Sequence, residues 1–303
     1  MLAIVIPYYK LTFFEETLMS LKTQTNQGFK VYIGDDASPE KPIELLERYK
    51  NNFDFVYHRF ETNLGSDSLV KQWERCITLT EDEKWLMILG DDDVIGSNVV
   101  EEFYKNMNEV EIENISVIRF STVKIDEHTK VMSEVYNHPK IENTVDYLFR
   151  RTRTSLSEFI FLKSKIIDIG FRELPLAWFS DVLAVLEFSD FKRIFTINAA
   201  TLKIRISNIS ISGKQNNLKL KSQATFKYYH YLLSNKRKYF NDDQRKILLI
   251  QLGKSYLNDK KNLSYFFKIS KIYVSNFLLI DYFRFIKSII NNYFKNESRI
   301  ESI

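Results

Sequence analysis

The sequence predicts an α/β fold, with a mixed, mostly parallel sheet flanked by helices and a helical region at the C-terminal end. Short apolar runs alternate with helical patterns through the first third of the chain, an order typical of βαβ units. Several of these runs end in polar turn residues, as the strands of a parallel sheet do. From Lys214 onward the patterns are helical, with little strand character. Only 8 Gly and 5 Pro occur in 303 residues, which excludes low-complexity and collagen-like chains.

The first four strands and helices follow from apolar runs and turn signals. Thr12 and Glu15 have the spacing of a capping box, which predicts a helix that extends to about Thr23. Asn63, Gly65 and Ser66 predict a turn into a helix that ends near residue 79. The four strands are expected at residues 3–7, 29–36, 53–60 and 84–89, and the other helices at 43–49 and 99–107.

The later elements are less regular. A helix is predicted to begin near Ser180, and residues 193–207 form one or two strands. A polar, turn-like stretch at residues 212–217 predicts the boundary between a first domain, 1–213, and a helical region, 214–303. The other expected elements are a strand at 115–125, a short helix at 145–151, and a strand running into a helix at 157–171.

Composition and charge limit the possible classes of protein. No apolar run reaches the roughly 18 residues of a membrane-spanning helix, and no signal peptide is recognised at the N-terminus. The single cysteine, Cys76, lies in a helical pattern, so we expect a packed, inert thiol in a reducing compartment. From Lys214 to the end there are 18 Lys and Arg against 6 Asp and Glu, a net charge of +12, so the preceding residues carry −8. This asymmetry predicts two regions with different roles.

Carboxylates follow two of the predicted strands. Asp35 and Asp36 end the second strand, and Asp91, Asp92 and Asp93 follow the fourth. Because the carboxyl ends of parallel strands meet at one edge of a sheet, these five acids are expected to converge there. Hard cations such as Mg²⁺ and Mn²⁺ prefer carboxylate ligands and often share them with phosphate oxygens. The alternative is a solvated acidic turn, but the second acidic pair favours a metal and nucleotide site.

Four stretches, in this order, resemble the family 2 glycosyltransferases, whose nucleotide-binding domain has the fold called GT-A. They are IVIPYYK, YIGDDASPE, ETNLGSDSLVKQW and MILGDDDVIGSNVV, and the resemblance covers about the first two-thirds of the chain. The last stretch is similar to the family's Asp-x-Asp metal motif. Gly90 stands at the family's first Asp position and Ser97 at a position that is often Pro. This departure leaves two registers open, one with Asp92 as the metal ligand and one with Asp91 and Asp93 as the pair.

The resemblance implies roles for individual residues. We take Asp92 as the metal contact with Asp93 second, and Asp91 as a neighbour of the ribose or phosphate. Asp36 would accept a hydrogen bond from the nucleobase imide, and Pro7 and Tyr9 would frame the base. The alternative for Asp36 is a helix N-cap or an Asx-turn.

An inverting transferase needs a general base, and the diphosphate leaving group needs cationic contacts. Asp181, which opens the helix after Pro175 and Trp178, is the candidate base. Its alternative role is that of a first-turn residue favoured by the helix dipole, and Glu173 would then be the next candidate. Arg205 is the candidate diphosphate contact, because a guanidinium matches phosphate well; the alternative is a solvated arginine. The four histidines, which form no spaced metal pair, are expected at the surface; they are His58, His128, His138 and His230.

The C-terminal region is rich in Lys, Tyr and Phe. An apolar stripe at helical spacing, Tyr282, Phe285, Ile286, Ile289, Ile290 and Tyr293, predicts a basic amphipathic helix. Such a helix either lies on an anionic membrane surface or packs against its own domain or another chain. No motif for nucleic-acid binding accompanies it.

The resemblance, together with these residues, implies an inverting transferase that uses Mn²⁺ or Mg²⁺ and moves a sugar from a nucleotide-diphosphate sugar, expected to be a UDP-sugar. The acceptor would be a hydroxyl of a saccharide or lipid-linked saccharide, in bacterial surface polysaccharide synthesis, in the cytoplasm or on the inner face of the membrane. One alternative is a sugar nucleotidyltransferase, whose Gly-rich N-terminal loop is missing, since the first glycine is Gly28. The other is a non-catalytic protein that binds nucleotide sugars or membranes.

Overall fold

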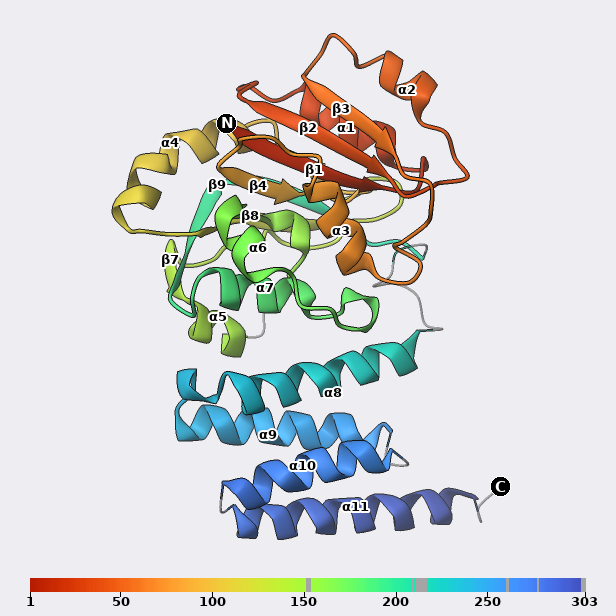
Figure 1. Cartoon of the computed structure of the whole chain (residues 1–303), viewed down its shortest axis with the longest axis vertical. Coiled ribbons are helices and arrows are strands. Elements are labelled where there is room, and N and C mark those ends of the chain that lie inside the picture. Colours follow the sequence, from red (N-terminus) through yellow and green to blue (C-terminus); the bar gives the residue numbers. More distant parts are fainter. Residues whose placement is uncertain (151–153, 209, 211–216, 260–261, 277, 301–303) are drawn as a thin grey trace. The chain divides into compact units, whose positions relative to one another are not determined.

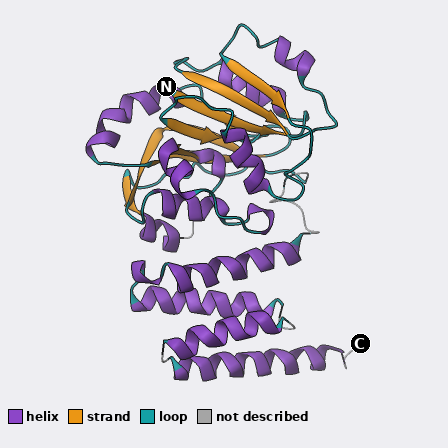
Figure 2. Ribbon diagram, in the orientation of Figure 1, coloured by secondary structure: helices purple, strands orange, loops and turns teal. Residues whose placement is uncertain are grey.

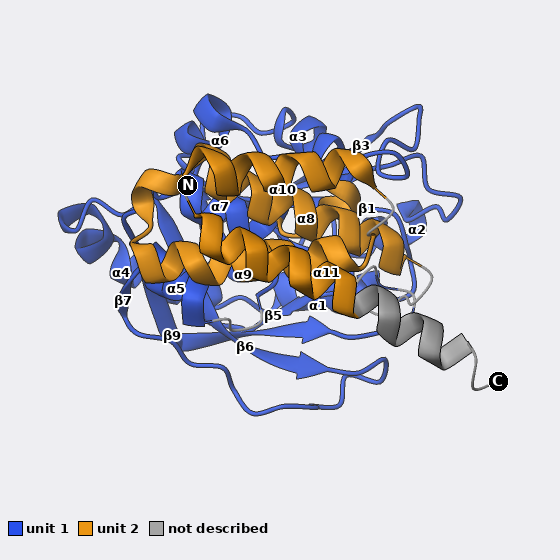
Figure 3. Ribbon diagram, turned by 90° about the horizontal axis from the view of Figure 1, so that it is seen from below, with its two compact units in different colours: residues 1–173, 180–214 blue, residues 174–179, 215–303 orange. Residues whose placement is uncertain are grey.

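The computed structural model describes residues 1–303 except 151–153, 209, 211–216, 260–261, 277 and 301–303. The chain forms two compact units, coloured separately in Figure 3. Unit 1 comprises residues 1–173 and 180–214, and unit 2 comprises residues 174–179 and 215–303. The stretch 212–217, where the sequence predicts a domain boundary, lies outside the described residues except for Asn217.

Unit 1 is built on one mixed sheet, whose strands are orange in Figure 2. The strand order is β3-β2-β1-β4-β8-β6-β9-β5, with β7 paired to β9. The first four strands in the chain are mutually parallel, while β8 runs antiparallel to β4 and β6. The predicted fold class is confirmed. The strands are β1 Leu2–Tyr8, β2 Phe29–Asp35, β3 Phe55–Arg59, β4 Trp85–Ile88, β5 Val94–Ile95, β6 Val117–Ile125, β7 Ile141–Asn143, β8 Phe159–Leu162 and β9 Arg193–Arg205.

Strand β1 lies in the middle of the parallel part of the sheet. Its residues 2–6 are fully buried, as expected for a strand covered on both faces and therefore almost continuously apolar. Tyr8 pairs with Asp35 of β2, and Val5 pairs with Ile88 of β4. This register brings the carboxyl ends of the three strands, and the polar residues that follow them, to the same edge of the sheet.

Helices flank the sheet (Figure 1). α3 begins at its cap Ser68, whose side chain accepts a hydrogen bond from the Lys71 amide. The capping box predicted at Thr12 and Glu15 is wrong, because α1 begins at Phe14 and its cap, Phe13, makes no side-chain hydrogen bond. The helices of unit 1 are α1 Phe14–Lys22, α2 Ile43–Glu47, α3 Leu69–Ile77, α4 Val99–Ile112, α5 Thr144–Arg150, α6 Lys163–Ile169, α7 Ser180–Phe188 and a 3₁₀ turn, η1, Leu156–Glu158.

Two details of the core bear on the predictions made for β9 and Cys76. Strand β9 is one long strand of 13 residues, and its pairing with β6 shifts register between Phe120 and Ser121. Cys76 is buried against β2 and burial raises the pKa of its thiol to about 12. The prediction of an inert thiol agrees with this environment.

Unit 2 is helical. The predicted apolar stripe divides there. Phe285 is buried against Tyr256 and Tyr273, and the Tyr282 ring contacts that of Tyr273 in a tilted arrangement, whereas Ile290 is exposed. Among the described residues, no helix is both long and apolar enough to cross a membrane. The elements are η2 Pro175–Ala177, α8 Leu218–Asn235, η3 Arg237–Tyr239, α9 Asp242–Leu257, α10 Leu263–Ser275 and α11 Leu279–Ile300.

Candidate active site

The loop that follows β4 is tied to the loop that follows β1. The Asp91 carboxylate accepts hydrogen bonds from the backbone amides of Tyr9 and Lys10, both at 2.8 Å. Burial raises the pKa of Asp91, against these two hydrogen bonds, which lower it. Asp91 therefore holds together the two strand ends where a nucleotide is expected to bind.

The Asp93 carboxylate is hydrogen-bonded within the protein. It is 5% exposed, its Oδ1 accepts from the Arg205 backbone amide at 2.9 Å, and its Oδ2 accepts from the Ser157 hydroxyl at 2.5 Å. Both carboxylate oxygens thus have protein donors. Asp93 as a second metal ligand stays a prediction. Its observed contacts anchor residues 90–93, called the acidic loop below, to β9 and to η1.

Asp92 has the opposite environment. Its carboxylate accepts no hydrogen bond from any residue that the structure describes, although it is partly buried and lies beside two other acids. Burial, followed by repulsion from Asp93 and Asp91, raises its pKa well above the usual value. An oxygen donor with no protein partner fits a hard divalent cation.

The remaining ligands of such a cation do not come from a ready-made protein cage. The described residues include no group of three or more His, Cys, Asp or Glu side chains placed to hold a metal ion. A single carboxylate suits the Mg²⁺ type of site, in which water and substrate phosphates supply most ligands. The donor set at Asp92 therefore fits a metal that arrives with a nucleotide diphosphate.

The conformation of the acidic loop leaves no space for a side chain at Gly90. A Cβ added at this position would lie 3.0 Å from Asp92 Oδ1 and 3.2 Å from Asp93 Oδ2, closer than most side-chain contacts. The Gly90 amide also donates to the Ser157 hydroxyl at 3.1 Å. The space that a side chain would need at this position is filled by the carboxylates of Asp92 and Asp93.

Arg205, the predicted diphosphate contact, is 2% exposed. Its Nε donates to the Asp92 carbonyl at 2.9 Å, its Nη1 to the Asp126 carbonyl at 2.8 Å, and its Nη2 to the Glu16 carboxylate at 2.7 Å. The guanidinium also lies over the ring of Phe13, 4.3 Å from its centroid. These contacts make Arg205 a support of the Asp92 backbone, and the diphosphate contact stays a prediction.

The acids that follow β2 are each neutralised by an arginine. Asp35 is fully buried and pairs with Arg59 at 2.7 Å. Asp36 pairs with Arg75 and accepts from the amides of Leu64 and Gly65 at 2.7 and 2.9 Å. Burial has the largest effect on the pKa of Asp36 and raises it.

The two acidic groups therefore lie at one sheet edge but have different partners. Asp36 orders the predicted 63–65 turn through the Leu64 and Gly65 amides, a contact that sequence reasoning missed. Next to it, Tyr9 is exposed and its carbonyl accepts from the Ser38 hydroxyl at 2.6 Å, while Pro7 is partly exposed within β1. The base-binding roles of Pro7, Tyr9 and Asp36 stay predictions.

Asp181 lies in the first turn of α7, as the sequence predicts. Its carboxylate accepts a hydrogen bond from the Thr154 hydroxyl at 3.3 Å, and burial raises its pKa. Glu173, the alternative base, is half-exposed and lies 4.0 Å from the Lys71 ammonium. A partly buried acid at a helix start, with a raised pKa, has the environment that a general base needs, whereas Glu173 has that of a surface residue.

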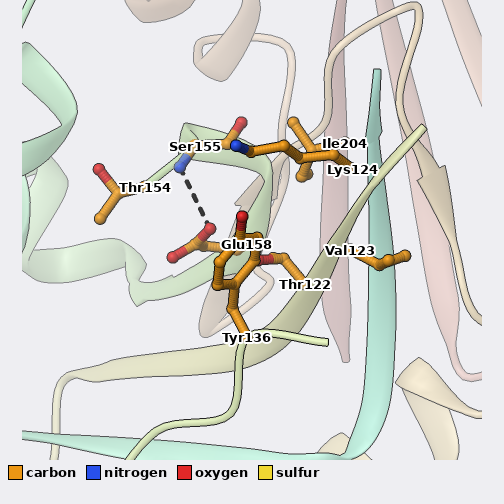
Figure 4. A pocket seen from close by; sticks show the side chains of 8 residues that line it. All are labelled: Thr122, Val123, Lys124, Tyr136, Thr154, Ser155, Glu158 and Ile204. Carbon is orange, nitrogen blue, oxygen red and sulfur yellow. Dashed lines mark hydrogen bonds between the residues drawn. The ribbon is translucent and has the colours of Figure 1, made fainter. Parts of the chain in front are cut away.

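The turn formed by residues 154–158 was missed by sequence reasoning. Ser155 and Glu158 form a capping box around η1, and this Ser-x-x-Glu spacing was the available signal. Glu158 also pairs with the fully buried Arg119 at 2.7 Å. Figure 4 shows Thr154, Ser155 and Glu158 lining a small pocket with residues of β6, of β9 and of the 126–140 loop.

One histidine prediction is wrong. His138 is 6% exposed rather than at the surface, and its Nδ1 lies 2.9 Å from the Arg150 guanidinium. Burial, with the nearby arginines, lowers its pKa to about 3. His138 is therefore a neutral core residue, a property that no local sequence signal indicates.

Comparisons with known proteins agree with this geometry. The sequence profile described as glycosyl transferase family 2 matches residues 3–168, and a search of curated proteins finds no match. Among solved structures, S. aureus TarS residues 1–349 in complex with UDP-GlcNAc is similar at 15% identity and a TM-score of 0.63, covering 85% of this chain and 72% of that one. TarS residues 1–349 in complex with UDP is similar at 15% identity and a TM-score of 0.55, covering 84% and 80%.

The match of the family profile extends over more than half of the chain, through β1, the acidic loop after β4, and η1. The likeness to TarS, at low identity, concerns the fold alone. The chain belongs to glycosyl transferase family 2, and its sheet has the GT-A fold.

Proposed function

We propose that the protein is a metal-dependent, inverting glycosyltransferase that moves a sugar from a UDP-sugar to an acceptor hydroxyl. The observation that carries the proposal is the pairing of two acids with different chemistry. Asp92 keeps a carboxylate without a protein partner among the described residues, at the strand edge where nucleotides bind in α/β sheets. Asp181 is partly buried, has a raised pKa, and accepts a hydrogen bond from Thr154 of a neighbouring turn.

The nucleotide would bind across the ends of β1, β2 and β4. Asp36 has three donors at present, and a carboxylate offers about four acceptor positions, so one remains for a uracil imide. Pro7 and Tyr9 would frame the base, and Asp91 would lie by the ribose or phosphate. The TarS complexes with UDP-GlcNAc and with UDP support a uridine nucleotide as the donor class.

Asp92 would hold the metal, with Asp93 and Arg205 keeping its loop in place. A bound Mn²⁺ or Mg²⁺ would neutralise charge on the departing diphosphate. The protein's own contribution is geometric. Arg205 binds the Asp92 carbonyl, and Asp93 is fixed on both oxygens, so the Asp92 carboxylate is presented from a rigid loop.

Asp181 would act as the general base. The acceptor oxygen attacks the anomeric carbon, its proton passes to the Asp181 carboxylate, and the bond from that carbon to the diphosphate oxygen breaks with inversion. A base works best when its pKa approaches the working pH. Burial raises the pKa of Asp181 in this direction.

We place the reaction in bacterial surface polysaccharide synthesis, with a saccharide or lipid-linked saccharide as acceptor and no nucleic-acid partner. The enzyme would work in the cytoplasm or on the inner face of the membrane. Exposed apolar side chains on the outer surfaces of α10 and α11 support a membrane contact, among them Leu263, Phe267, Ile280 and Phe283. Exposed cations lie on the same two helices, namely Lys268, Lys271, Arg284 and Lys287, as interfacial helices require.

Binding of UDP and UDP-sugars, measured with and without Mn²⁺, tests the proposed nucleotide and metal site. UDP and UDP-sugars with Mn²⁺ should raise the melting temperature, because a ligand that binds only the folded state stabilises it. Asp92→Asn should abolish the metal-dependent part of the increase, whereas Asp67→Asn, a change at an exposed acid before α3, should not. An equal response to UDP with and without Mn²⁺ in both variants would contradict the assignment of Asp92.

A further inference from the structure

A single short turn makes hydrogen bonds to both parts of the proposed site. Thr154 and Ser157 lie three residues apart, at the start and within the turn that ends at Glu158. The Ser157 hydroxyl donates to Asp93 Oδ2 at 2.5 Å and accepts from the Gly90 amide at 3.1 Å. It therefore fixes the acidic loop at two points on either side of Asp92.

The other end of the turn reaches the candidate base. The Thr154 hydroxyl donates to Asp181 Oδ2 at 3.3 Å, and a donor of this kind both orients a carboxylate and favours its charged form. Asp181 has no other side-chain donor among the described residues that contact it. Thr154 is thus the side chain that orients the carboxylate, beside hydrogen bonds from the backbone of Val182 and Asp181.

The turn itself is anchored in the core. Glu158 accepts from the Ser155 amide at 3.2 Å, seen as the dashed line in Figure 4, and pairs with Arg119. The Arg119 guanidinium lies 5.2 Å from the centroid of Tyr147 and 5.5 Å from that of Phe159. The turn is therefore held in place by a buried ion pair that lies beside two aromatic rings.

We propose that Ser157 and Thr154 are positioning residues, which set the metal-binding acid and the general base in one frame through the 154–158 turn. This inference rests on the proposed function. Ser157 acts through the acidic loop and determines how well Asp92 binds the metal. Thr154 acts through Asp181 and determines the protonation of the base.

The two roles predict different losses. Ser157→Ala removes the donor to Asp93 and the acceptor for Gly90, so Mn²⁺-dependent affinity for UDP should fall about 10- to 100-fold, the usual effect of removing a residue that supports a metal ligand. Ser157→Thr, which keeps the hydroxyl, should restore most of it. Ser189→Ala is the matched control, since Ser189 is equally buried but bonds only within its own helix end. Affinity is measured by calorimetry, and Mn²⁺ binding by electron paramagnetic resonance.

Thr154→Val keeps the shape and removes the hydrogen bond. Donor affinity should not change, while the acidic limb of the pH–rate profile should move to higher pH, because Asp181 loses a donor that favours its charged form. A merely structural role would lower the rate at every pH without moving the limb. If Ser157→Ala does not fold, Ser157→Cys, whose thiol is a weak donor, replaces it in the same comparison.

The outcomes separate the inference from the proposed function. Wild-type Mn²⁺ affinity in Ser157→Ala overturns the role of Ser157, and an unmoved limb in Thr154→Val overturns that of Thr154, even when Asp92→Asn and Asp181→Asn behave as proposed. If the wild-type protein binds no Mn²⁺–UDP and Asp92→Asn changes nothing, the proposed function is wrong, and the inference falls with it.

Discussion

Asp92 and Asp93 are adjacent in the chain but have opposite surroundings. The Asp93 carboxylate has two protein donors, whereas that of Asp92 has none among the described residues and is repelled by its neighbours. Residues that bind ligands often reduce stability in this way, because the ligand supplies the missing partner.

The contrast predicts opposite effects on stability. Without metal, Asp92→Asn should leave the melting temperature unchanged or raise it, since it removes one of three repelling charges. Asp93→Ala should lower the melting temperature and reduce the free energy of unfolding by about 1–3 kcal/mol, because the Ser157 hydroxyl and the Arg205 amide lose their acceptor. Thermal unfolding of both variants checks this. A larger loss in Asp92→Asn than in Asp93→Ala would contradict the assignment of roles.

At the same scale, the sequence could locate the acids but not distinguish them. Three consecutive aspartates after an apolar strand predict an acidic site, yet nothing local shows which carboxylate meets Ser157 or Arg205. Those partners are 64 and 112 residues away along the chain. For the same reason Arg205 could be identified as a cation near the site, while its burial beneath the acidic loop could not.

Among the elements, β2 and α3 show how close packing positions the site. Gly34 faces Cys76, and a Cβ at Gly34 would press into the Cys76 sulfur and lie 3.1 Å from the Phe60 ring. Cys76 follows Arg75, the partner of Asp36. The contact between Gly34 and Cys76 therefore sets how closely α3 approaches the acid that follows β2.

Gly34→Ala should destabilise the protein by about 1–3 kcal/mol, the range for overpacking a core. Adding Cys76→Ala should recover part of this loss, which a double-mutant cycle measures by chemical unfolding. Gly253→Ala is the control, because its added methyl would lie 3.4 Å from Phe285 inside a helix, where Ala is favoured by about 1 kcal/mol. Additive effects of the Gly34 and Cys76 changes would show that the contact is not the cause.

The helices and strands themselves were the part of the fold that the sequence predicted best. Apolar runs of strand length and 3.6-residue periodicity depend on local sequence, so β1 to β4 and their helices were foreseen. The residue at which a helix begins was harder to predict. Thr12 has the spacing of a helix cap, but α1 begins at Phe14. The antiparallel insertion of β8 between β4 and β6 is a tertiary pairing that no single segment encodes.

At the scale of the whole molecule, charge and apolar exposure differ between the two units. Unit 2 buries Phe285 and Tyr273 in its own core but leaves Phe267 and Phe283 more than half exposed. The predicted membrane helix thus uses part of its apolar stripe for packing. Its proposed membrane contact depends on the other, exposed side chains.

The intact protein should be recruited to anionic vesicles, and high salt should weaken recruitment, because each Lys or Arg near such a surface contributes about 1 kcal/mol, screened by salt. Combined Phe267→Ser and Phe283→Ser changes should reduce recruitment without lowering the melting temperature. Ile112→Ser, at a 74% exposed residue of α4, is the control. Flotation that is absent, or insensitive to salt and to the Phe changes, would show that these helices meet a protein partner or none.

The central claim, that Asp181 is the base of a glycosyl transfer, has its most direct test in Asp181→Asn, which keeps the shape and removes the basicity. Transfer from the UDP-sugar that binds best should fall about 10²- to 10⁴-fold, with donor affinity unchanged. In the wild type the rate should fall as the pH drops through the pKa of Asp181, which burial raises, so the acidic limb should lie above that of an exposed aspartate. Transfer that survives in Asp181→Asn within a few-fold would contradict the account.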